Sequence, residues 1–148
     1  KDALSTLNAD RAFILEMHNG TNNVAGLPFI YGEMTYEEVR NEITHVDEDY
    51  TSINLSRFAF PMYLEKNHMW NGNINELGRV DQTLAARLAS NDVTYFAIIA
   101  LHGVNNKLGY FGFSFCNGKQ PPGESEIEKC LNSPAQRLSI LLDSNSTY

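Results

Sequence analysis

The chain has 148 residues, a net charge of −7, 43% hydrophobic and 11% aromatic residues, and two cysteines. This length and composition can bury the core of one domain, and the lack of any Lys/Arg cluster argues against a nucleic-acid partner. The longest apolar run, YFAIIAL, falls far short of the roughly 20 residues that span a bilayer.

The first third of the chain predicts a helix end within residues 1–10, followed by two extended segments. The segment RAFILEMH, residues 11–18, alternates as a strand does, and LPFIYGEMTYEEV, residues 27–39, is a second extended candidate. One face of the first strand carries Phe13, Leu15 and Met17, and the other carries Ile14, Glu16 and His18.

The middle of the chain, residues 40–78, is the least regular part. A short helix is expected within residues 55–68, although Pro61 and scattered Asn residues obscure its limits. A clearer helix follows, because Asp81 is a suitable N-cap and Asn91 a suitable end.

The C-terminal part predicts a β-hairpin and a long helix. Two β-rich runs, residues 94–103 and 107–116, are joined by VNN, and Gly109 and Gly112 in the second run indicate close packing or a bulge. An amphipathic helix is expected over residues 125–143. Its inward side chains would be Ile127, Cys130, Leu131, Leu138, Leu141 and Leu142.

These C-terminal elements, with a Pro/Gly break and an acidic residue before the last helix, resemble the end of GAF domains. The Leu108-Gly109 step is similar to one in that family, and ALSTLNADRAFILEMH resembles its opening helix and first strand. The resemblance implies an α+β fold, with a GAF/PAS-like central antiparallel sheet and the N- and C-terminal helices packed on one face. It also implies one domain over residues 1–148, which we expect to be excised from a longer chain.

The resemblance further implies a sensor or regulatory module that binds cyclic nucleotides, chromophores or other small molecules. The Asn-Lys…Phe…Asp-Glu pattern of the cyclic-nucleotide binders is not found here, and both cysteines lie where core packing is expected. The HNG…GLPF…TYEE segment resembles a GAF-like subgroup of bacterial and phage proteins that often follows a membrane segment. The overall outline is also similar to the periplasmic domain of T-even-type phage holins.

The segment EMHNGTNNVAGLPF, residues 16–29, predicts a long loop that borders a pocket or contacts a partner. His18 and Asn19 would supply polar groups, and Gly20 would let the backbone approach a ligand. The alternative is structural: Asn-Gly is a favoured turn pair, Phe29 a core residue and Glu37 part of a solvated edge. The candidate ligand- or partner-binding residues are Glu16, His18, Asn19, Gly20, Asn23, Phe29 and Glu37.

No catalytic, phosphate-binding or metal-binding motif occurs, so we expect no enzyme activity, no metal and no cofactor. Cys116 and Cys130 are compatible with a disulfide or with two reduced thiols. The first hypothesis is a sensory domain that binds a small molecule or a protein, in a bacterial or phage protein with a membrane anchor. The alternative is the extracytoplasmic domain of a holin-like lysis regulator that binds an inhibitory protein, and a homodimer is compatible with both. The sequence does not decide the cellular compartment of the domain.

Overall fold

The fold is seen in a computed structural model that describes residues 9–22, 28–39, 53–54, 63–64, 67–102 and 107–145. Its main feature is a six-stranded sheet with the order β3-β2-β1-β6-β5-β4, in which all paired neighbours are antiparallel. The strands are β1 (Arg11–Asn22), β2 (Pro28–Val39), β3 (Ile53–Asn54), β4 (Met69–Asn73), β5 (Val93–His102) and β6 (Lys107–Cys116). The helices are α3 (Ile74–Leu77), α4 (Gln82–Ala89) and α5 (Glu124–Asn145).

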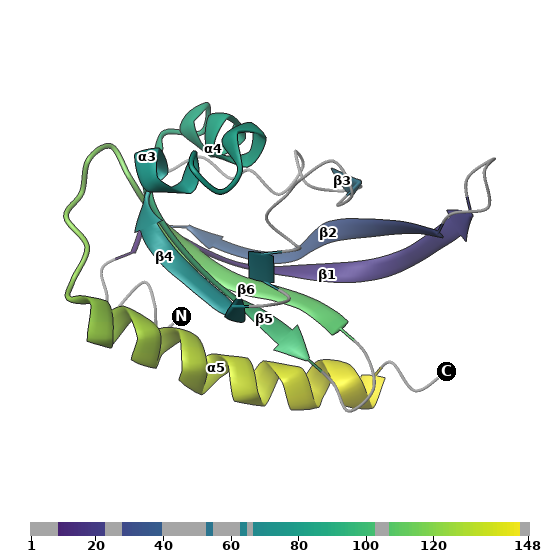
Figure 1. Cartoon of the computed structure of the whole chain (residues 1–148). Coiled ribbons are helices and arrows are strands. Elements are labelled where there is room, and N and C mark those ends of the chain that lie inside the picture. The colour runs from purple at the N-terminus through teal and green to yellow at the C-terminus, as the bar shows by residue number, and fades with distance from the viewer. Residues whose placement is uncertain are drawn as a thin grey trace.

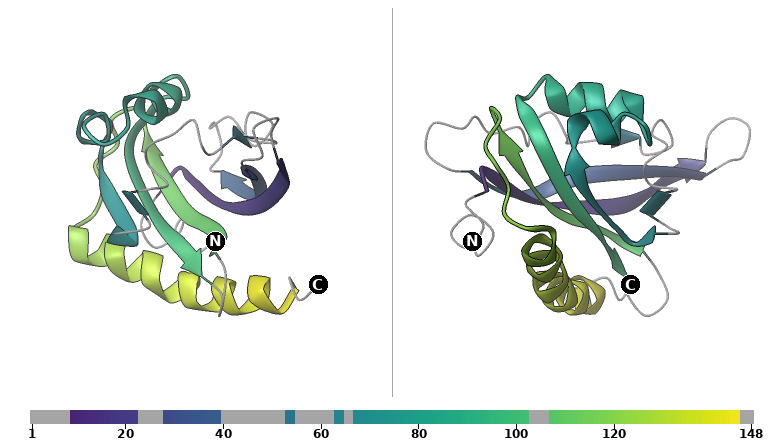
Figure 2. Two further views of the ribbon diagram at one scale, coloured as in Figure 1. Left: turned by 45° about the vertical axis from the view of Figure 1, so that its right-hand side comes forward. Right: turned by 60° about the vertical axis from the view of Figure 1, so that its left-hand side comes forward.

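The helices lie on both sides of the sheet (Figure 1). Helix α5 runs along one face, which we call the α5 face, while α3 and α4 lie over the other, the α4 face (Figure 2). The predicted antiparallel α+β architecture is confirmed, including a C-terminal helix packed on one face. The predicted N-terminal helix lies outside the described residues.

The α5 face is closed by large apolar side chains from the sheet and the helix. Phe113 and Phe115 of β6 are fully buried and meet edge to face, with ring centroids 6.1 Å apart. Ile127 and Leu131 of α5 are also fully buried against this layer. Complete burial of such a side chain stabilises the fold by about 1.5–3 kcal/mol, so this face holds α5 firmly.

Two glycines of β6 allow close backbone contacts, as their positions in the sequence predicted. Gly109 has φ of 150°, and a Cβ atom there would lie 2.0 Å from the carbonyl oxygen of Leu15. A Cβ on Gly112 would lie 2.6 Å from the carbonyl oxygen of Ala97 and 2.7 Å from the Phe13 ring. The ladder between β5 and β6 also shifts register next to Gly109. Both the close packing and the irregularity are therefore present.

Local capping explains the two short helices. In α3, the Asn73 side chain accepts a hydrogen bond from the Glu76 backbone, and the Glu76 carboxylate accepts one from the Asn73 backbone, which forms a capping box. The predicted N-cap of α4 is confirmed, because Asp81 Oδ1 accepts from the Leu84 N–H at 2.9 Å. This helix ends at Ala89, with Ser90 as its C-cap, two residues before the predicted Asn91.

Three sequence predictions about elements are corrected. The HNG segment is not part of a loop, because β1 continues through it to Asn22 in a ladder with β2. The MWNGN segment, predicted to be irregular, is the edge strand β4 and pairs with β5. Leu141 does not point inward: it is 58% exposed, near the C-terminal end of α5.

The other expectations for these regions are confirmed or fall outside the described residues. The hairpin of β5 and β6 and the extended segment β2 are confirmed. Of the helix expected within 55–68, residues 63–64 and 67 are helical and the remainder, apart from residue 68, is not described. The Leu142 side chain is likewise outside the description.

Candidate ligand-binding face

The α4 face is apolar but less completely buried than the α5 face. Its buried set comes from β5, β6, α3, α4 and residue 64, while Phe13, Leu15 and Met34 of β1 and β2 are only partly buried. Tyr63 and Trp70 add two more partly buried rings to this cluster. Partly exposed apolar side chains in one contiguous group are typical of binding surfaces. This face is the strongest candidate site among the described residues.

Aromatic rings form the centre of the α4 face. Phe13 of β1 and Phe96 of β5 stack with centroids 5.9 Å apart and an angle of 7° between their planes. Gly112 pairs directly with Phe13 and leaves room for its ring, while Phe96 pairs with Ser114, two residues further along β6. The lack of a side chain at Gly112 therefore leaves room for this stack, which we call the aromatic platform, and in it Phe13 is partly exposed and Phe96 is 3% exposed.

Tyr110 lies further along β6 on the same face. It pairs with Leu15 on one side and with Ala100 on the other, and only 6% of the residue is exposed. Burial raises the pKa of its hydroxyl to about 12, so this group stays protonated at neutral pH. Its hydroxyl has no hydrogen-bond partner among the residues that the structure describes.

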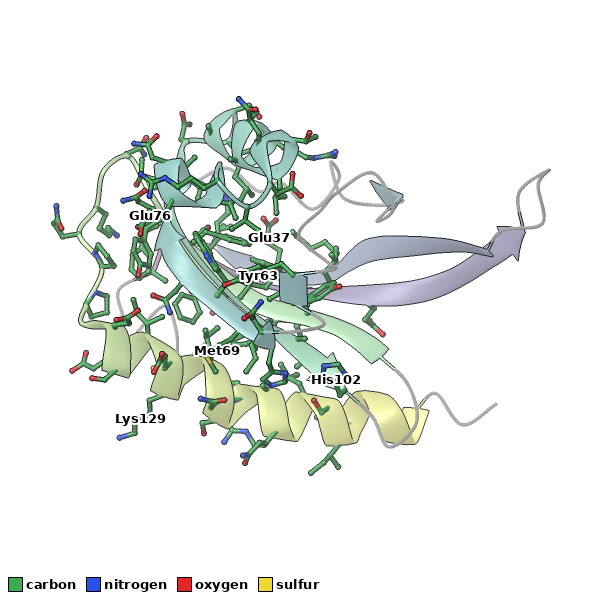
Figure 3. All side chains as sticks on the ribbon, viewed as in Figure 1. Glu37, Tyr63, Met69, Glu76, His102 and Lys129 are labelled. Carbon is green, nitrogen blue, oxygen red and sulfur yellow. The ribbon has the colours of Figure 1, made fainter. Side chains whose placement is uncertain are left out.

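The structure separates two carboxylates that the sequence prediction placed around one pocket. Glu37 pairs with Phe13 in the β1–β2 ladder, so it lies on the α4 face, where Figure 3 shows it above the sheet. Glu16 pairs with Glu33 and Gly109, and strand alternation places it on the opposite face, with Ile14. Both glutamates are half-buried, but they do not converge.

The other predicted site residues belong to the outer part of the β1–β2 hairpin. His18 pairs with Tyr31, and Asn19 with Ile30, beyond the last residue of β1 that pairs with β6. Gly20 lies in β1 and Phe29 in β2, while Asn23 falls outside the described residues. The side chains at positions 18, 19 and 29 are also outside the description, so their binding roles stay predictions.

A buried polar network at the start of β1 was not predicted. Asp10 Oδ2 accepts a hydrogen bond from the Cys116 N–H, and Oδ1 accepts one from Lys119 Nζ, both at 2.7 Å. Arg11 is also buried and donates to the Asn91 carbonyl at 3.1 Å and to Cys116 Sγ at 3.4 Å. The network ties the start of β1 to the end of β6 and to the turn after α4, which indicates a structural role.

Two histidines that are far apart in the sequence also meet. The rings of His68 and His102 stack with centroids 5.4 Å apart. Burial, and to a smaller extent the charge of His102, lowers the pKa of His68. His68 has φ of 68° and connects a helical turn to β4, since its N–H donates to the Leu64 carbonyl and its carbonyl accepts from Ala100.

An open surface cavity of about 410 Å³ lies beside the start of α3. Polar residues form most of its lining, including Asn73, Asp92 and Asn117. Asp92 and Asn117 both have left-handed backbones and are joined by a 3.0 Å hydrogen bond, so they close a turn at the end of the sheet. Among the described residues, no three His, Cys, Asp or Glu side chains could hold a metal ion together.

Comparison with known proteins identifies the architecture. The chain matches no family model and no curated protein. It is similar to the solved GAF domain of a two-component sensor histidine kinase from Bacillus halodurans, with a TM-score of 0.69 and 12% identity over 99% of this chain and 90% of that one. The chain has the GAF fold.

Two further GAF structures show the same likeness. One is a Synechocystis GAF domain in its photoproduct state, with a TM-score of 0.64 and 15% identity, over 97% of this chain and 88% of that one. The other is the phycocyanobilin-bound GAF domain of a cyanobacterial phytochrome, with a TM-score of 0.63 and 12% identity, over 95% and 80%. The GAF resemblance inferred from the sequence is therefore confirmed at the level of the fold.

Both cysteines of the chain are free thiols in the structure. Cys116 is buried with the α4-face cluster, whereas Cys130 of α5 packs with the cluster on the other face. Of the two alternatives that the sequence left open, the structure therefore has the two free thiols and not the disulfide, because the sheet lies between the two side chains. Burial raises the pKa of the Cys116 thiol, and the nearby Arg11 partly opposes this shift. No helix among the described residues is long and apolar enough to cross a membrane.

Proposed function

We propose that the chain is a non-catalytic sensory domain that binds a small organic molecule on its α4 face. The observation that carries this proposal is the difference between the two faces of the GAF sheet. The centre of the α5 face is filled by fully buried side chains, and Ile14 is its one partly buried apolar residue described on β1 and β2, while the α4 face keeps three there, Phe13, Leu15 and Met34. Burial of such a surface by a ligand would supply the hydrophobic part of the binding energy.

The related structures support a small molecule as the ligand. One similar GAF domain holds phycocyanobilin and another holds biliverdin, so this fold accommodates large organic molecules. Covalent attachment to this chain is disfavoured, because Cys116 is buried against Arg11 and Cys130 packs on the other face of the sheet. We therefore infer a non-covalent ligand.

The hairpin residues predicted from the sequence remain part of the proposal. Glu37 is already on the α4 face, and His18, Asn19 and Gly20 lie on the same hairpin further out. These residues would form an outer rim or a partner contact, and not the floor of the site. Expression as part of a membrane-anchored bacterial or phage protein, and dimer formation, are further predictions of the sensor hypothesis.

A thermal-shift screen against nucleotides, tetrapyrroles and metabolites tests the proposal, with two matched variants. Leu15 and Ile14 are adjacent and half-buried, but they pack with the clusters on opposite faces. Leu15→Asn should abolish a ligand-induced rise in Tm, whereas Ile14→Asn should lower the ligand-free Tm by a similar amount and keep the ligand response. Equal ligand responses in the two variants would place the site elsewhere, and loss of response in His18→Ala or Asn19→Ala alone would assign it to the hairpin.

The holin-like alternative is less well supported. That hypothesis predicts an exposed apolar patch and favours a Cys116–Cys130 bridge, but both thiols are free. The exposed large aliphatic side chains in the described part of the chain are Ile140 and Leu141, near the end of α5. With Tyr36 of β2, 46% exposed, these are the three exposed large hydrophobic side chains of the described residues. Three such side chains are a small area for a stable protein interface, so the small-molecule hypothesis is preferred.

A further inference from the structure

The buried hydroxyl of Tyr110 is unusual for the interior of a protein. Buried polar groups almost always have a hydrogen-bond partner, because an unpaired group loses its interactions with water without replacement. Only 6% of Tyr110 is exposed, yet its hydroxyl has no hydrogen-bond partner among the described residues. A phenylalanine would fill nearly the same space without this cost, so the hydroxyl calls for a functional explanation.

The immediate neighbours of Tyr110 disfavour a charged ligand group beside its hydroxyl. Its neighbours across the sheet, Leu15 and Ala100, are apolar. Arg11 also lies on this face, but it is four residues from Leu15 along β1, roughly 13 Å away at the usual strand rise, and its guanidinium already donates to Asn91 and Cys116. A charged ligand group beside Tyr110 would therefore be buried without a counter-charge from these residues, which is costly.

The Phe13–Phe96 stack supplies a complementary surface on the same face. The two rings are almost parallel, and Phe13 is only partly buried. Phe13 and Leu15 are alternate residues of β1, so the stack lies close to Leu15, the direct neighbour of Tyr110. A planar aromatic molecule can pack on such rings with a favourable offset geometry. The aromatic rings thus favour a planar ligand, and the Tyr110 hydroxyl favours a ligand with a hydrogen-bond acceptor.

We propose that Tyr110 donates a hydrogen bond to a carbonyl-type acceptor of an uncharged, planar aromatic ligand that packs on the α4 face. This inference rests on the proposed sensory function and specifies the chemistry of its ligand. A phenolic hydroxyl is a strong donor, and a carbonyl oxygen would provide the partner that Tyr110 lacks. The ligand would need no charged group at this end of the site.

The test compares two probes of nearly the same shape, 9-fluorenone and fluorene, which differ in one carbonyl group. Wild-type protein should bind fluorenone about tenfold more tightly, as expected for one buried hydrogen bond. Tyr110→Phe should remove this preference by weakening fluorenone binding alone. Without ligand, the variant should be at least as stable as wild type, because it removes an unpaired buried hydroxyl. Binding can be measured by fluorescence titration or calorimetry and stability by thermal unfolding.

Tyr95→Phe is the matched control. The Tyr95 hydroxyl donates to Asn71 Oδ1 at 2.8 Å, and its ring packs with the α5-face cluster. This variant should be somewhat less stable than wild type and should keep the preference for fluorenone.

Equal binding of the two probes by wild type, or an unchanged preference in Tyr110→Phe, would overturn the assignment of Tyr110. A large loss of stability in ligand-free Tyr110→Phe would also do so, because it would reveal an existing partner for the hydroxyl. Failure of both probes to bind wild type would reject the proposed ligand class. The broader sensor proposal would survive each of these results if a molecule in the screen bound in a way that Leu15→Asn abolished.

Discussion

Replacement of Asp10 by Ala should destabilise the domain strongly, although Asp10 is only one residue before the first strand. The Asp10 carboxylate accepts hydrogen bonds from the Cys116 N–H and from Lys119 Nζ, and both residues are more than 100 positions away in the sequence. Its side chain is 4% exposed, and that of Lys119 is 29% exposed. The interaction is therefore screened less than a surface ion pair.

The expected loss can be estimated from these two contacts. A hydrogen bond to a charged group contributes about 1.5–3 kcal/mol, and the contact with the partly hydrated Lys119 belongs at the lower end. Asp10→Ala also leaves the Cys116 N–H without its acceptor. We expect a loss of about 3 kcal/mol in the free energy of unfolding for Asp10→Ala. Asp10→Asn should lose about 1 kcal/mol, because its amide oxygen can still accept from Cys116.

Urea unfolding followed by Trp70 fluorescence provides the measurement, since the chain has one tryptophan. The free energies should be compared at an unchanged m-value, which reports that the same surface is exposed. Lys119→Met and the double variant with Asp10→Asn complete a cycle that isolates the ion pair. Losses below about 1 kcal/mol for Asp10→Ala would refute a stabilising role of the network.

Three more outcomes are expected. Gly112→Ala should lower the free energy of unfolding by more than about 2 kcal/mol, because the added Cβ would lie 2.6 Å from a backbone oxygen. Gly123→Ala is the control and should fold normally, because its Cβ would point into open space. Leu131→Ala, at a fully buried position, should lower the free energy of unfolding by about 2–5 kcal/mol. Leu141→Ala should lower it far less, because Leu141 is more than half exposed. Similar losses in the two variants would contradict the packing of α5. Stability should fall as the pH drops through the ordinary histidine value of 6.5, because the pKa of His68 is lowered in the folded state and the unfolded chain takes up the proton first. Between pH 7.5 and 5, the urea midpoint should depend less on pH in His68→Asn than in wild type. Asn is chosen because it tolerates the left-handed backbone at this position.

Local sequence signals predicted the parts of the fold that depend on neighbouring residues. The β5–β6 hairpin follows from two β-rich runs around VNN, and the start of α4 from Asp81. The same kind of reasoning failed for HNG and MWNGN, because Asn and Gly favour turns and disfavour strands. Pairing with β2 in the first case and with β5 in the second overrides this preference. Partners that are distant in the sequence decide these two strands.

The candidate site was less predictable for the same reason. Sequence alternation could place Phe13 and Leu15 on one face of a strand, but it could not show which face is incompletely covered. Tyr110 looked like one more aromatic residue of a strand, because the missing hydrogen bond becomes visible only when its neighbours are known. Glu37 was selected with Glu16 as part of one pocket, and only the ladder shows that the two lie on opposite faces.

The alternation in β5 and β6 links the fold to the proposed function. Both strands are apolar on their two faces, so each face needs its own cover. Helix α5 covers one face along most of its length and fixes Phe113 and Phe115 in full burial. On the other face, the described helices α3 and α4 cover mainly the β5 side, while Phe13 and Leu15 on β1 stay partly exposed. A ligand that covers the exposed part of the α4 face would stabilise the folded domain, and this change in stability can signal that the ligand is bound. The α5 face would stay unchanged and keep the sheet in place.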